Sequence, residues 1–564
     1  MKKLKDCKYT VSDGVLTVTN GCFSHSLSDI ISADACVEDN NGLSMPFLHI
    51  TAQTASGAER ELCLWDDLPT VYFPCFRENR LLTLTGDHWS VRTVKLHAFT
   101  DENDTLTEEN EYHLFKHKLT GSRKGDIFFL EDAQSGNAVV IVSETPDYRT
   151  STITVRAGVV AVENGGNGLA LGFCRVGECE SLCREYYRHA RRSEGLVTMS
   201  NTWGDRNGFK RVCEEFILQE IDAARDMGVD IVQIDDGWQS GSTADPTRRD
   251  ELDRRTFLGD FWELDQAKFP NGMRAVTDYA AQYGIKIGLW FAPDSHDCFA
   301  LLERDKAVLR RAYAEWGIRF FKLDMFWISS SEEQSKFLEL LREIYSFGDD
   351  VAVQLDVTRD QRMNYLCGRQ YGTVFVENRY HRGATSYPHR ILRNLWMLGR
   401  YLPTNKFQFE MINPDLYVDD YPADDPFAPS LYGQDYLFAS VMLCNPLFWQ
   451  EMQFLSAARR EELKPIMDIW KQHRSELANA DVLPIGQKPS GRSFTGFCVT
   501  VNGTPKYLLL FREATDEATA VINAPISEGE TKVLISNSDA QIKLSNGTVH
   551  VSLSKQRAYA WVML

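Results

Sequence analysis

The spacing of apolar and polar positions divides the chain into three parts, and in the first, residues 1–195, the two kinds of position alternate. Segments such as GVLTVTN at 14–20 and TSTITVRAGVVAVE at 150–163 are separated by Gly, Asn and Asp. A period of two is typical of strands that bury one face. Their regular recurrence predicts an N-terminal antiparallel β-sandwich, which ends in a helical linker, ESLCREYYRHARRSEG, at 180–195.

Residues 196–480 alternate apolar runs of strand length with helical patterns. Eight runs are candidate strands: LVTMSNTW (196–203), VDIVQIDDGW (229–238), IKIGLWFAPD (285–294), IRFFKLDMF (318–326), DVAVQLDVT (350–358), GTVFVENRY (372–380), KFQFEMINPD (406–415) and VMLCNPLFWQE (441–451). Runs that are apolar on consecutive positions indicate strands covered on both faces, as in a parallel sheet. Because eight such strands close a barrel, this part is predicted to be a (β/α)8 TIM barrel. The helical stretches at 209–228 and 273–284 each end at a Gly that can cap a helix.

Residues 481–564 return to short strands separated by turns. The pairs Asn502–Gly503 and Asn546–Gly547 each lie between apolar runs and predict tight hairpins. This part is therefore predicted to be a small C-terminal antiparallel β domain. The chain as a whole is predicted to be multidomain, with limits at 1–195, 196–480 and 481–564.

Acidic residues follow several of the predicted barrel strands at the point where each strand ends. Asp235 and Asp236 follow the second strand, Asp324 the fourth, Asp356 the fifth and Glu377 the sixth. Because the chemistry of a parallel barrel lies at the C-terminal ends of its strands, these acids are candidate functional groups. Lys322 precedes Asp324 by two residues and so shares its side of the strand, where its charge can hold Asp324 ionised. The alternative is that Asp324 caps the helix that SSSEEQ at 329–334 begins.

Tryptophans accompany these acids. Trp203 ends the first strand, Trp238 follows the second, Trp262 lies in the long loop after it, and Trp290 lies in the third strand. Sugar hydroxyls bind carboxylates, and the C–H faces of a sugar pack on aromatic rings. A single Trp is more often part of a core. The combination of acids and tryptophans favours a carbohydrate site.

Composition and charge limit the classes of function. The chain is 43% hydrophobic and 25% charged, which excludes wholesale disorder. The net charge of −18 argues against nucleic acid and other polyanions as partners. No window of 18 apolar residues occurs, so no membrane span is predicted. A neutral or cationic ligand is easier to accommodate. The oligomeric state stays open, and a homo-oligomer is one of the alternatives.

The cysteines predict neither a disulfide framework nor a metal site. There are 13, scattered without metal-type spacing, and the closest local pair, Cys179 and Cys183, falls in a helical pattern where such residues pack. No metal or other cofactor is therefore predicted. The N-terminal lysines are not followed by an apolar signal segment. We expect a reducing, cytoplasmic location, or a periplasmic one if a leader has been removed.

Four motifs occur in a fixed order in the barrel: IDDGW at 234–238, LGDFW…KFPNG at 258–272, GLWFAPD at 288–294 and FKLD at 321–324. Together they resemble glycoside hydrolase family 36, the α-galactosidase family of clan D. The resemblance covers the central barrel, and the three-domain layout is similar too. It implies a retaining hydrolase that cleaves terminal α-linked sugars, most of all α-galactosides, by double displacement. The implied partner is an oligosaccharide or glycoside.

The resemblance also implies roles for individual residues. Asp324 matches the catalytic nucleophile, and Lys322 matches a lysine that contacts sugar hydroxyls. Asp235 and Asp236 match an acid pair that holds the C4 and C6 hydroxyls, and Trp262 matches an aromatic residue lining the sugar pocket. The family's acid/base lies after the sixth strand, where this sequence reads VFVENRYHR and places Glu377 instead of an aspartate.

Two further departures from the family pattern affect recognition of the sugar. The usual GLWFEPE has Ala292 in place of its first acid, and LDVTRDQRMNY at 355–365 replaces a glycine- and cysteine-rich loop. The second change puts Asp356, Arg359 and Arg362 near the sugar's C2 substituent. Asp356 is the alternative acid/base, although the two arginines would hold it ionised. Arg379 lies close to Glu377 in sequence and would oppose its protonation.

Three other functions remain open at this point. A carbohydrate-binding barrel without catalysis would tolerate the changed acid/base, and a transglycosylase of the same family differs only in the acceptor of the intermediate. A barrel metalloenzyme would use the same acids as Mg²⁺ or Mn²⁺ ligands. The metalloenzyme is the least favoured, because no strand end carries a paired His.

Overall fold

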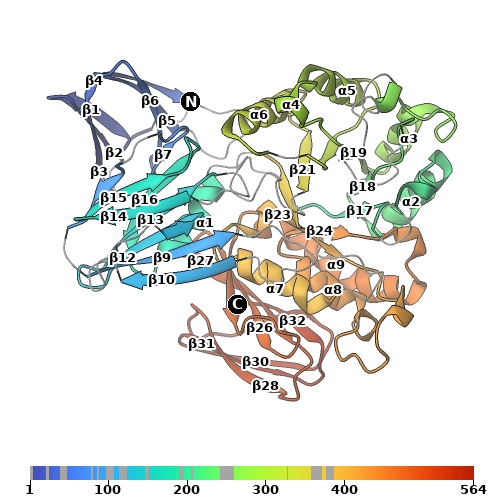
Figure 1. Ribbon diagram of the computed structural model, residues 1–564. Helices are drawn as coiled ribbons and strands as arrows, with labels where there is room; N and C mark the ends of the chain where they lie inside the picture. The colour runs from blue at the N-terminus through green and yellow to red at the C-terminus, as the bar shows by residue number, and fades with distance from the viewer. Residues whose placement is uncertain are drawn as a thin grey trace.

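The structure is a computed structural model (Figure 1). It describes residues 4–20, 24–38, 47–77, 80–85, 88–96, 107–113, 123–145, 151–189, 195–204, 208–241, 260–326, 328–356, 371–376 and 386–564. An N-terminal antiparallel β domain, a closed barrel of eight parallel strands with helices around it, and C-terminal antiparallel sheets follow one another along the chain. The predicted fold class is confirmed.

The N-terminal domain is built from sixteen strands in the described residues. They are β1 Lys8–Ser12, β2 Val15–Thr19, β3 Ser24–Ser28, β4 Ile30–Glu38, β5 Phe47–Thr54, β6 Glu59–Trp65, β7 Leu68–Phe73, β8 Leu82–Thr83, β9 Trp89–Leu96, β10 Thr107–His113, β11 Arg123–Gly125, β12 Ile127–Asp132, β13 Asn137–Ser143, β14 Ser151–Arg156, β15 Val159–Glu163 and β16 Leu169–Arg175. The main sheet has the order β10-β9-β12-β13-β16-β7-β6-β5-β4.

Strand β6 shows why this sheet is buried on both faces. Leu62 and Leu64 belong to the core shared with the smaller N-terminal sheets, whereas Cys63 and Trp65 belong to the core that continues into the barrel. Successive side chains of a strand point to opposite faces, so one strand supplies both cores. The turn after Trp65 is a surface turn: the Asp66 carboxylate accepts the backbone N–H groups of residues 5–7 at 2.7–3.0 Å.

The linker helix α1, Cys179–His189, joins the three parts of the molecule. Cys179 and Cys183 are buried in the core on the barrel side of the sheet, which confirms that this pair packs. Arg184, only 3% exposed, donates to Asp481 at the start of the C-terminal domain and to the backbone carbonyl of Arg400 in the barrel. A charged side chain this deeply buried requires such partners.

The barrel contains all eight predicted strands, each paired in parallel with its neighbours and closed by β17 against β24. They are β17 Met199–Asn201, β18 Ile231–Ile234, β19 Lys286–Phe291, β20 Phe320–Leu323, β21 Ala352–Asp356, β22 Thr373–Val376, β23 Phe407–Met411 and β24 Asn445–Phe448. Met199, Ile231, Phe320, Phe375, Leu447 and Trp449 form one apolar cluster. Alternate residues of the strands therefore fill the barrel with side chains, as in a packed core.

Helices surround the barrel. They are α2 Glu214–Met227, α3 Gly272–Ala281, α4 His296–Phe299, α5 Leu302–Ala314, α6 Ser331–Tyr345, α7 Pro388–Leu398, α8 Gln434–Val441 and α9 Ala457–Leu477, with short 3-10 turns η1 Gly208–Arg211, η4 Asp260–Trp262, η5 Thr404–Lys406, η6 Val418–Asp420, η7 Pro429–Leu431 and η8 Met452–Phe454. Gly228 ends α2 with a φ of 74° and donates to the carbonyls of Ala224 and Arg225. The left-handed conformation is accessible to glycine without a Cβ clash, so this predicted cap is confirmed.

The C-terminal domain has a five-stranded sheet and a three-stranded sheet. Its strands are β25 Asp481–Gly486, β26 Phe494–Val501, β27 Thr504–Arg512, β28 Thr519–Asn523, β29 Lys532–Ser536, β30 Ala540–Ser545, β31 Thr548–Leu553 and β32 Ala558–Met563. Asn502 and Gly503, both at positive φ, turn β26 into β27, and Asn546–Gly547 turns β30 into β31. Both predicted hairpins are confirmed.

We retain 195 and 480 as proposed domain limits, since each falls in a connection between elements. The cysteines that the structure describes are free thiols. Among the described residues, no helix combines the length and apolar character that crossing a membrane requires.

Candidate active site

Lys322 lies at the centre of the candidate site, on β20 and inside the barrel. Its Nζ is 3.0 Å from Asp235 Oδ2, 3.7 Å from Asp356 Oδ2 and 3.9 Å from Asp324 Oδ2. These carboxylates come from three different strand ends, and the Lys322 side chain is only 3% exposed. Barrel closure thus brings together four charged residues predicted from the sequence.

Electrostatic interactions favour the ionised form of Lys322. Burial by itself would lower the pKa of Lys322, but the carboxylates of Asp235, Asp324 and Asp356 outweigh burial and raise that pKa above its ordinary value. The Lys322 ammonium also faces the rings of Trp449 and Phe375, at 5.1 and 5.4 Å from their centroids. A permanent cation therefore sits among the three acids.

Asp324 is the acid of this group that reaches furthest toward solvent, with 14% of its side chain exposed. Its Oδ2 accepts the indole N–H of Trp290 at 3.1 Å, and its Oδ1 accepts the backbone N–H of Met325 at 2.5 Å. Met325 has a φ of 55°, an uncommon value for a residue other than glycine. Two donors and a cation thus fix both oxygens of this carboxylate.

The alternative role for Asp324, as a helix cap, is wrong. Helix α6 begins at Ser331, and its cap is Ser330, whose hydroxyl accepts the backbone N–H of Glu333 at 3.1 Å. The SSSEEQ segment therefore supplies its own cap, as Ser commonly does. The Asp324 carboxylate instead makes its contacts at the barrel mouth.

Asp235 and Asp236 have different surroundings although they are adjacent. Asp235 Oδ2 accepts from Asn201 Nδ2 at 2.9 Å as well as from Lys322. Asp236 accepts from Gln239 Nε2 at 2.5 Å. Burial raises the pKa of Asp236 to about 7, with the charges of Asp235 and Asp324 acting in the same direction and the Gln239 hydrogen bond opposing it. One acid of the pair is held beside a cation, and the other takes up a proton near neutral pH.

The tryptophans predicted for the site form a cluster behind the carboxylates. Trp262, in η4, is 3% exposed and packs against Trp238 and Trp290, with ring centroids 5.8 and 5.9 Å apart. The Trp238 indole donates to the Trp290 carbonyl at 2.9 Å. This packing holds Trp290 where its own indole reaches Asp324. Trp203 is half-buried and packs on the apolar cluster that fills the barrel.

Several residues of the site were missed in the sequence. Trp449 and Phe375 face Lys322, Asn201 donates to Asp235, and Glu410 and Glu451 are buried acids at the last two strands. Trp449 and Glu451 lie at steps of two from Leu447, which points into the barrel. The period of a strand could therefore have found both. Asn201 gave no comparable signal.

The remaining predicted residues cannot be placed in this geometry. Strand β22 ends at Val376, and Glu377, Arg362, Arg359 and Arg379 lie outside the described residues. Asp356 is placed: it ends β21, is 2% exposed, and lies beside Lys322.

The stretch of sequence that carries these residues is similar to a known enzyme family. The Melibiase family model matches residues 164–334, a span that contains the Asp235–Lys322–Asp324 group. Over this span the chain is similar to the melibiase family, which includes glycoside hydrolase family 36. The family is one of α-galactosidase-like glycoside hydrolases. The matched span ends just inside α6 and leaves the later barrel strands outside it.

Individual proteins that are similar to this chain are α-galactosidases. The chain is 38% identical over 81 residues to α-galactosidase Mel36A of Lactobacillus acidophilus, a match that covers 14% of this chain and 10% of that protein. The sequence match thus spans about a tenth of the relative's length. The crystal structure of α-galactosidase AgaA from Geobacillus stearothermophilus has a TM-score of 0.66 at 12% identity and covers 95% of this chain and 87% of AgaA.

A second AgaA structure, of a doubly substituted variant in complex with raffinose, has a TM-score of 0.68 at 14% identity and covers 96% of this chain and 88% of that one. At such identities the likeness shows a shared fold. The fold extends over nearly the whole chain, and the family-model match covers residues 164–334.

Proposed function

We propose that this protein is a retaining glycoside hydrolase that cleaves terminal α-galactosides by double displacement. The observation that carries the proposal is the setting of Asp324 at the barrel mouth, where its carboxylate lies 3.9 Å from the Lys322 ammonium and accepts the Trp290 indole N–H at 3.1 Å. A carboxylate nucleophile must be ionised and correctly oriented, and a nearby cation and a hydrogen-bond donor favour these two properties. The galactoside specificity is supported by the names of the relatives and by the raffinose complex of AgaA.

In this mechanism Asp324 attacks the anomeric carbon, and a second carboxyl group protonates the leaving oxygen. Retaining enzymes place these two groups about 5–5.5 Å apart. We assign the second role to Glu377, because it follows the last residue of β22 in the sequence and comes two positions after Phe375, whose ring faces Lys322. The same residue then acts as a base and activates the water that releases the sugar.

The other charged residues bind substrate in the proposal. Asp235 and Asp236 accept hydrogen bonds from sugar hydroxyls, and Lys322 donates to a hydroxyl while it neutralises the acids. Asp356 and Arg362 contact the side of the sugar where this chain departs from the family pattern. Trp203, Trp262 and Trp290 supply the aromatic walls. Because the Lys322 ammonium already lies where a metal ion would sit between the carboxylates, this arrangement does not favour a barrel metalloenzyme.

The function is tested with a panel of aryl α-glycosides, the galactoside first, assayed with the full chain and with Asp324→Ala. We expect turnover of the α-galactoside with retention, seen as the α-anomer in an NMR spectrum of the first product. Asp324→Ala should reduce turnover by roughly 10⁴-fold or more, on the scale of nucleophile deletions in other hydrolases. Binding of galactose by an inactive native chain would instead identify a carbohydrate-binding barrel.

The assignment of Glu377 is tested against Asp356, its alternative. Glu377→Ala should cripple cleavage of sugar or alkyl aglycones, spare the first step with a good phenolic leaving group, and be rescued in part by azide, which attacks the intermediate without a general base. Asp356→Ala, the matched control, should lower kcat/KM about equally for all leaving groups. Leaving-group dependence and azide rescue in Asp356→Ala alone would reverse the two roles.

A further inference from the structure

A row of metal-ligating side chains crosses the N-terminal sheet on the face that turns toward the barrel. Cys36 on β4 is paired with His49 on β5, and His49 is paired with Cys63 on β6. Glu38 lies two residues beyond Cys36 and therefore shares its face of the sheet. The antiparallel register brings His49 beside Cys36 and Glu38, which lie 13 and 11 positions before it in the sequence.

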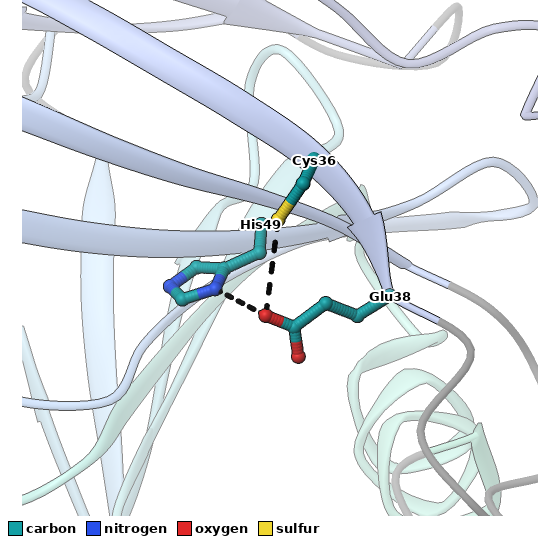
Figure 2. A group of neighbouring side chains, drawn as sticks. All are labelled: Cys36, Glu38 and His49. Carbon is teal, nitrogen blue, oxygen red and sulfur yellow. Dashed lines mark hydrogen bonds and ion pairs between the residues drawn. The ribbon is translucent and has the colours of Figure 1, made fainter.

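Three of these side chains converge on one point. The Glu38 carboxylate oxygen Oε1 lies 2.6 Å from His49 Nδ1 and 3.9 Å from Cys36 Sγ, as Figure 2 shows. One ligand atom from each residue lies within 4.8 Å of the others. Cys36 is exposed, while Glu38 and His49 are partly exposed, so an ion in solution can reach them.

The cluster lies at the wall of a cavity of about 460 Å³ between this sheet and helix α6. Glu38, His49 and Glu61 line the cavity from the sheet, and Ser331, Gln334 and Arg342 line it from α6. Ser331 also donates to Asn167 Oδ1 of the N-terminal domain at 3.1 Å. The cavity thus separates the N-terminal sheet from the helix that follows Asp324.

The donor set matches a transition-metal dication. Thiolate, imidazole and carboxylate are the three ligand types that zinc accepts, at bond lengths of about 2.0–2.3 Å, and hard cations such as Mg²⁺ avoid thiolates. In a tetrahedral site such bonds place ligand atoms roughly 3.3–3.7 Å apart. The sulfur–oxygen distance of 3.9 Å is close to this range. The nitrogen–oxygen contact of 2.6 Å holds a proton, and a metal would replace that proton as the contact opens.

The second nitrogen of His49 is placed for a supporting contact. Nε2 has no hydrogen-bond partner among the described residues, and Glu61 Oε2 lies 4.0 Å away. Metal-bound histidines usually donate their other N–H to a carboxylate, which fixes the ring and raises its basicity as a ligand. A small rotation of the partly exposed Glu61 completes that hydrogen bond.

We propose that Cys36, Glu38 and His49 form a binding site for a divalent transition-metal ion, with zinc the best match, and that Glu61 orients His49 from behind. Three protein ligands leave a fourth position for water or for a ligand from the adjoining cavity. Binding releases the thiol proton to solvent, and the imidazole proton that lay between Nδ1 and Glu38 moves to Nε2, where Glu61 accepts it. The site is separate from the barrel mouth and does not depend on the proposed hydrolase activity.

Cobalt substitution in the full chain, freed of metal by a chelator, tests the proposal. We expect one equivalent of Co²⁺ to produce a thiolate-to-cobalt charge-transfer band and the strong visible bands of a tetrahedral site. Cys36→Ser should abolish the charge-transfer band. The matched control is Cys75→Ser, an exposed cysteine that lines the same cavity outside the cluster and should leave the spectrum unchanged.

Zinc affinity, measured by competition with a chromophoric chelator, tests the individual roles. His49→Gln and Glu38→Gln should each weaken binding at least tenfold, and Glu61→Gln should weaken it roughly 10–100-fold as a supporting contact. A charge-transfer band that survives Cys36→Ser, or no one-to-one binding of either metal, would overturn the proposal. In that case the cluster is only a hydrogen-bonded His–Glu pair. Far-UV circular dichroism of each variant separates lost binding from lost folding.

Discussion

At the barrel mouth three carboxylates surround Lys322, whereas on the N-terminal sheet Glu38 and Glu61 flank His49 beside Cys36. The first group is almost entirely buried, with Lys322 3% exposed, and the second is 22–41% exposed at its His and Glu side chains. Buried anions require a partner that never leaves, because an unpaired buried charge is costly. Partly hydrated anions can share a proton or an exchangeable ion. In the barrel the partner of the acids is therefore a fixed lysine side chain, whereas the acids beside His49 stay partly accessible to solvent.

Removing the central side chain of each region should produce the largest difference in stability between the two regions. Lys322→Met leaves three carboxylates without their cation, and we expect it to destabilise the protein by about 3–5 kcal/mol. His49→Ala, in metal-free protein, should cost less than about 1 kcal/mol, as for exposed ion pairs. Urea unfolding followed by circular dichroism measures both. Equal losses in the two variants would show that burial does not separate the regions.

The donor that orients Asp324 provides a smaller test at the barrel mouth. Trp290→Phe keeps the ring packing but removes the indole N–H that donates to Asp324 Oδ2. We expect kcat/KM to fall by roughly 1.5 kcal/mol, about tenfold, because a hydrogen bond to a charged group is lost. The acid limb of the pH profile should shift to higher pH, since the ionised carboxylate loses a stabilising donor. A Trp262→Phe variant, which changes an aromatic wall but leaves the Trp290 indole N–H in place, should not move that limb.

Protonation of Asp236 should be seen in the pH dependence of stability. Burial raises its pKa to about 7, so the folded protein holds a proton that the unfolded chain loses near pH 4. Stability should therefore fall as pH rises from about 4 to 7, with a contribution of up to roughly 1.4 kcal/mol per pH unit, and level off above that range. Asp236→Asn should remove this contribution and lower kcat/KM, because the substitution replaces an acceptor of sugar hydroxyls.

Asp126 in the N-terminal domain is the matched control for this titration. It is buried, accepts the backbone N–H of Leu96 at 2.8 Å, and burial raises its pKa to about 7 as well. Asp126→Asn should flatten the same part of the stability curve without changing kcat/KM. Urea unfolding at several pH values gives the slopes. If Asp236→Asn left the slope unchanged while Asp126→Asn reduced it, Asp236 would be ionised throughout this range.

Much of the architecture followed from local patterns. The eight barrel strands were predictable because consecutive apolar positions mark strands covered on both faces, and the hairpins at Asn502–Gly503 and Asn546–Gly547 were predictable from turn chemistry. The neighbourhood of Lys322 and Asp324 was predictable for a similar reason, since residues two apart on a strand share a side. These properties depend on the nearest neighbours along the chain.

The sequence by itself thus determined which segments form the barrel strands, and it placed Asp235, Asp236, Asp324 and Asp356 at the ends of three of them. Only the tertiary structure decided that Ser330 rather than Asp324 caps α6, that Trp449 faces Lys322, and that Trp262 lies behind Trp290. It alone decided that Cys36, Glu38 and His49 converge. The physical reason is that cross-strand register and barrel closure join positions far apart in sequence, and their contacts depend on how the whole chain packs.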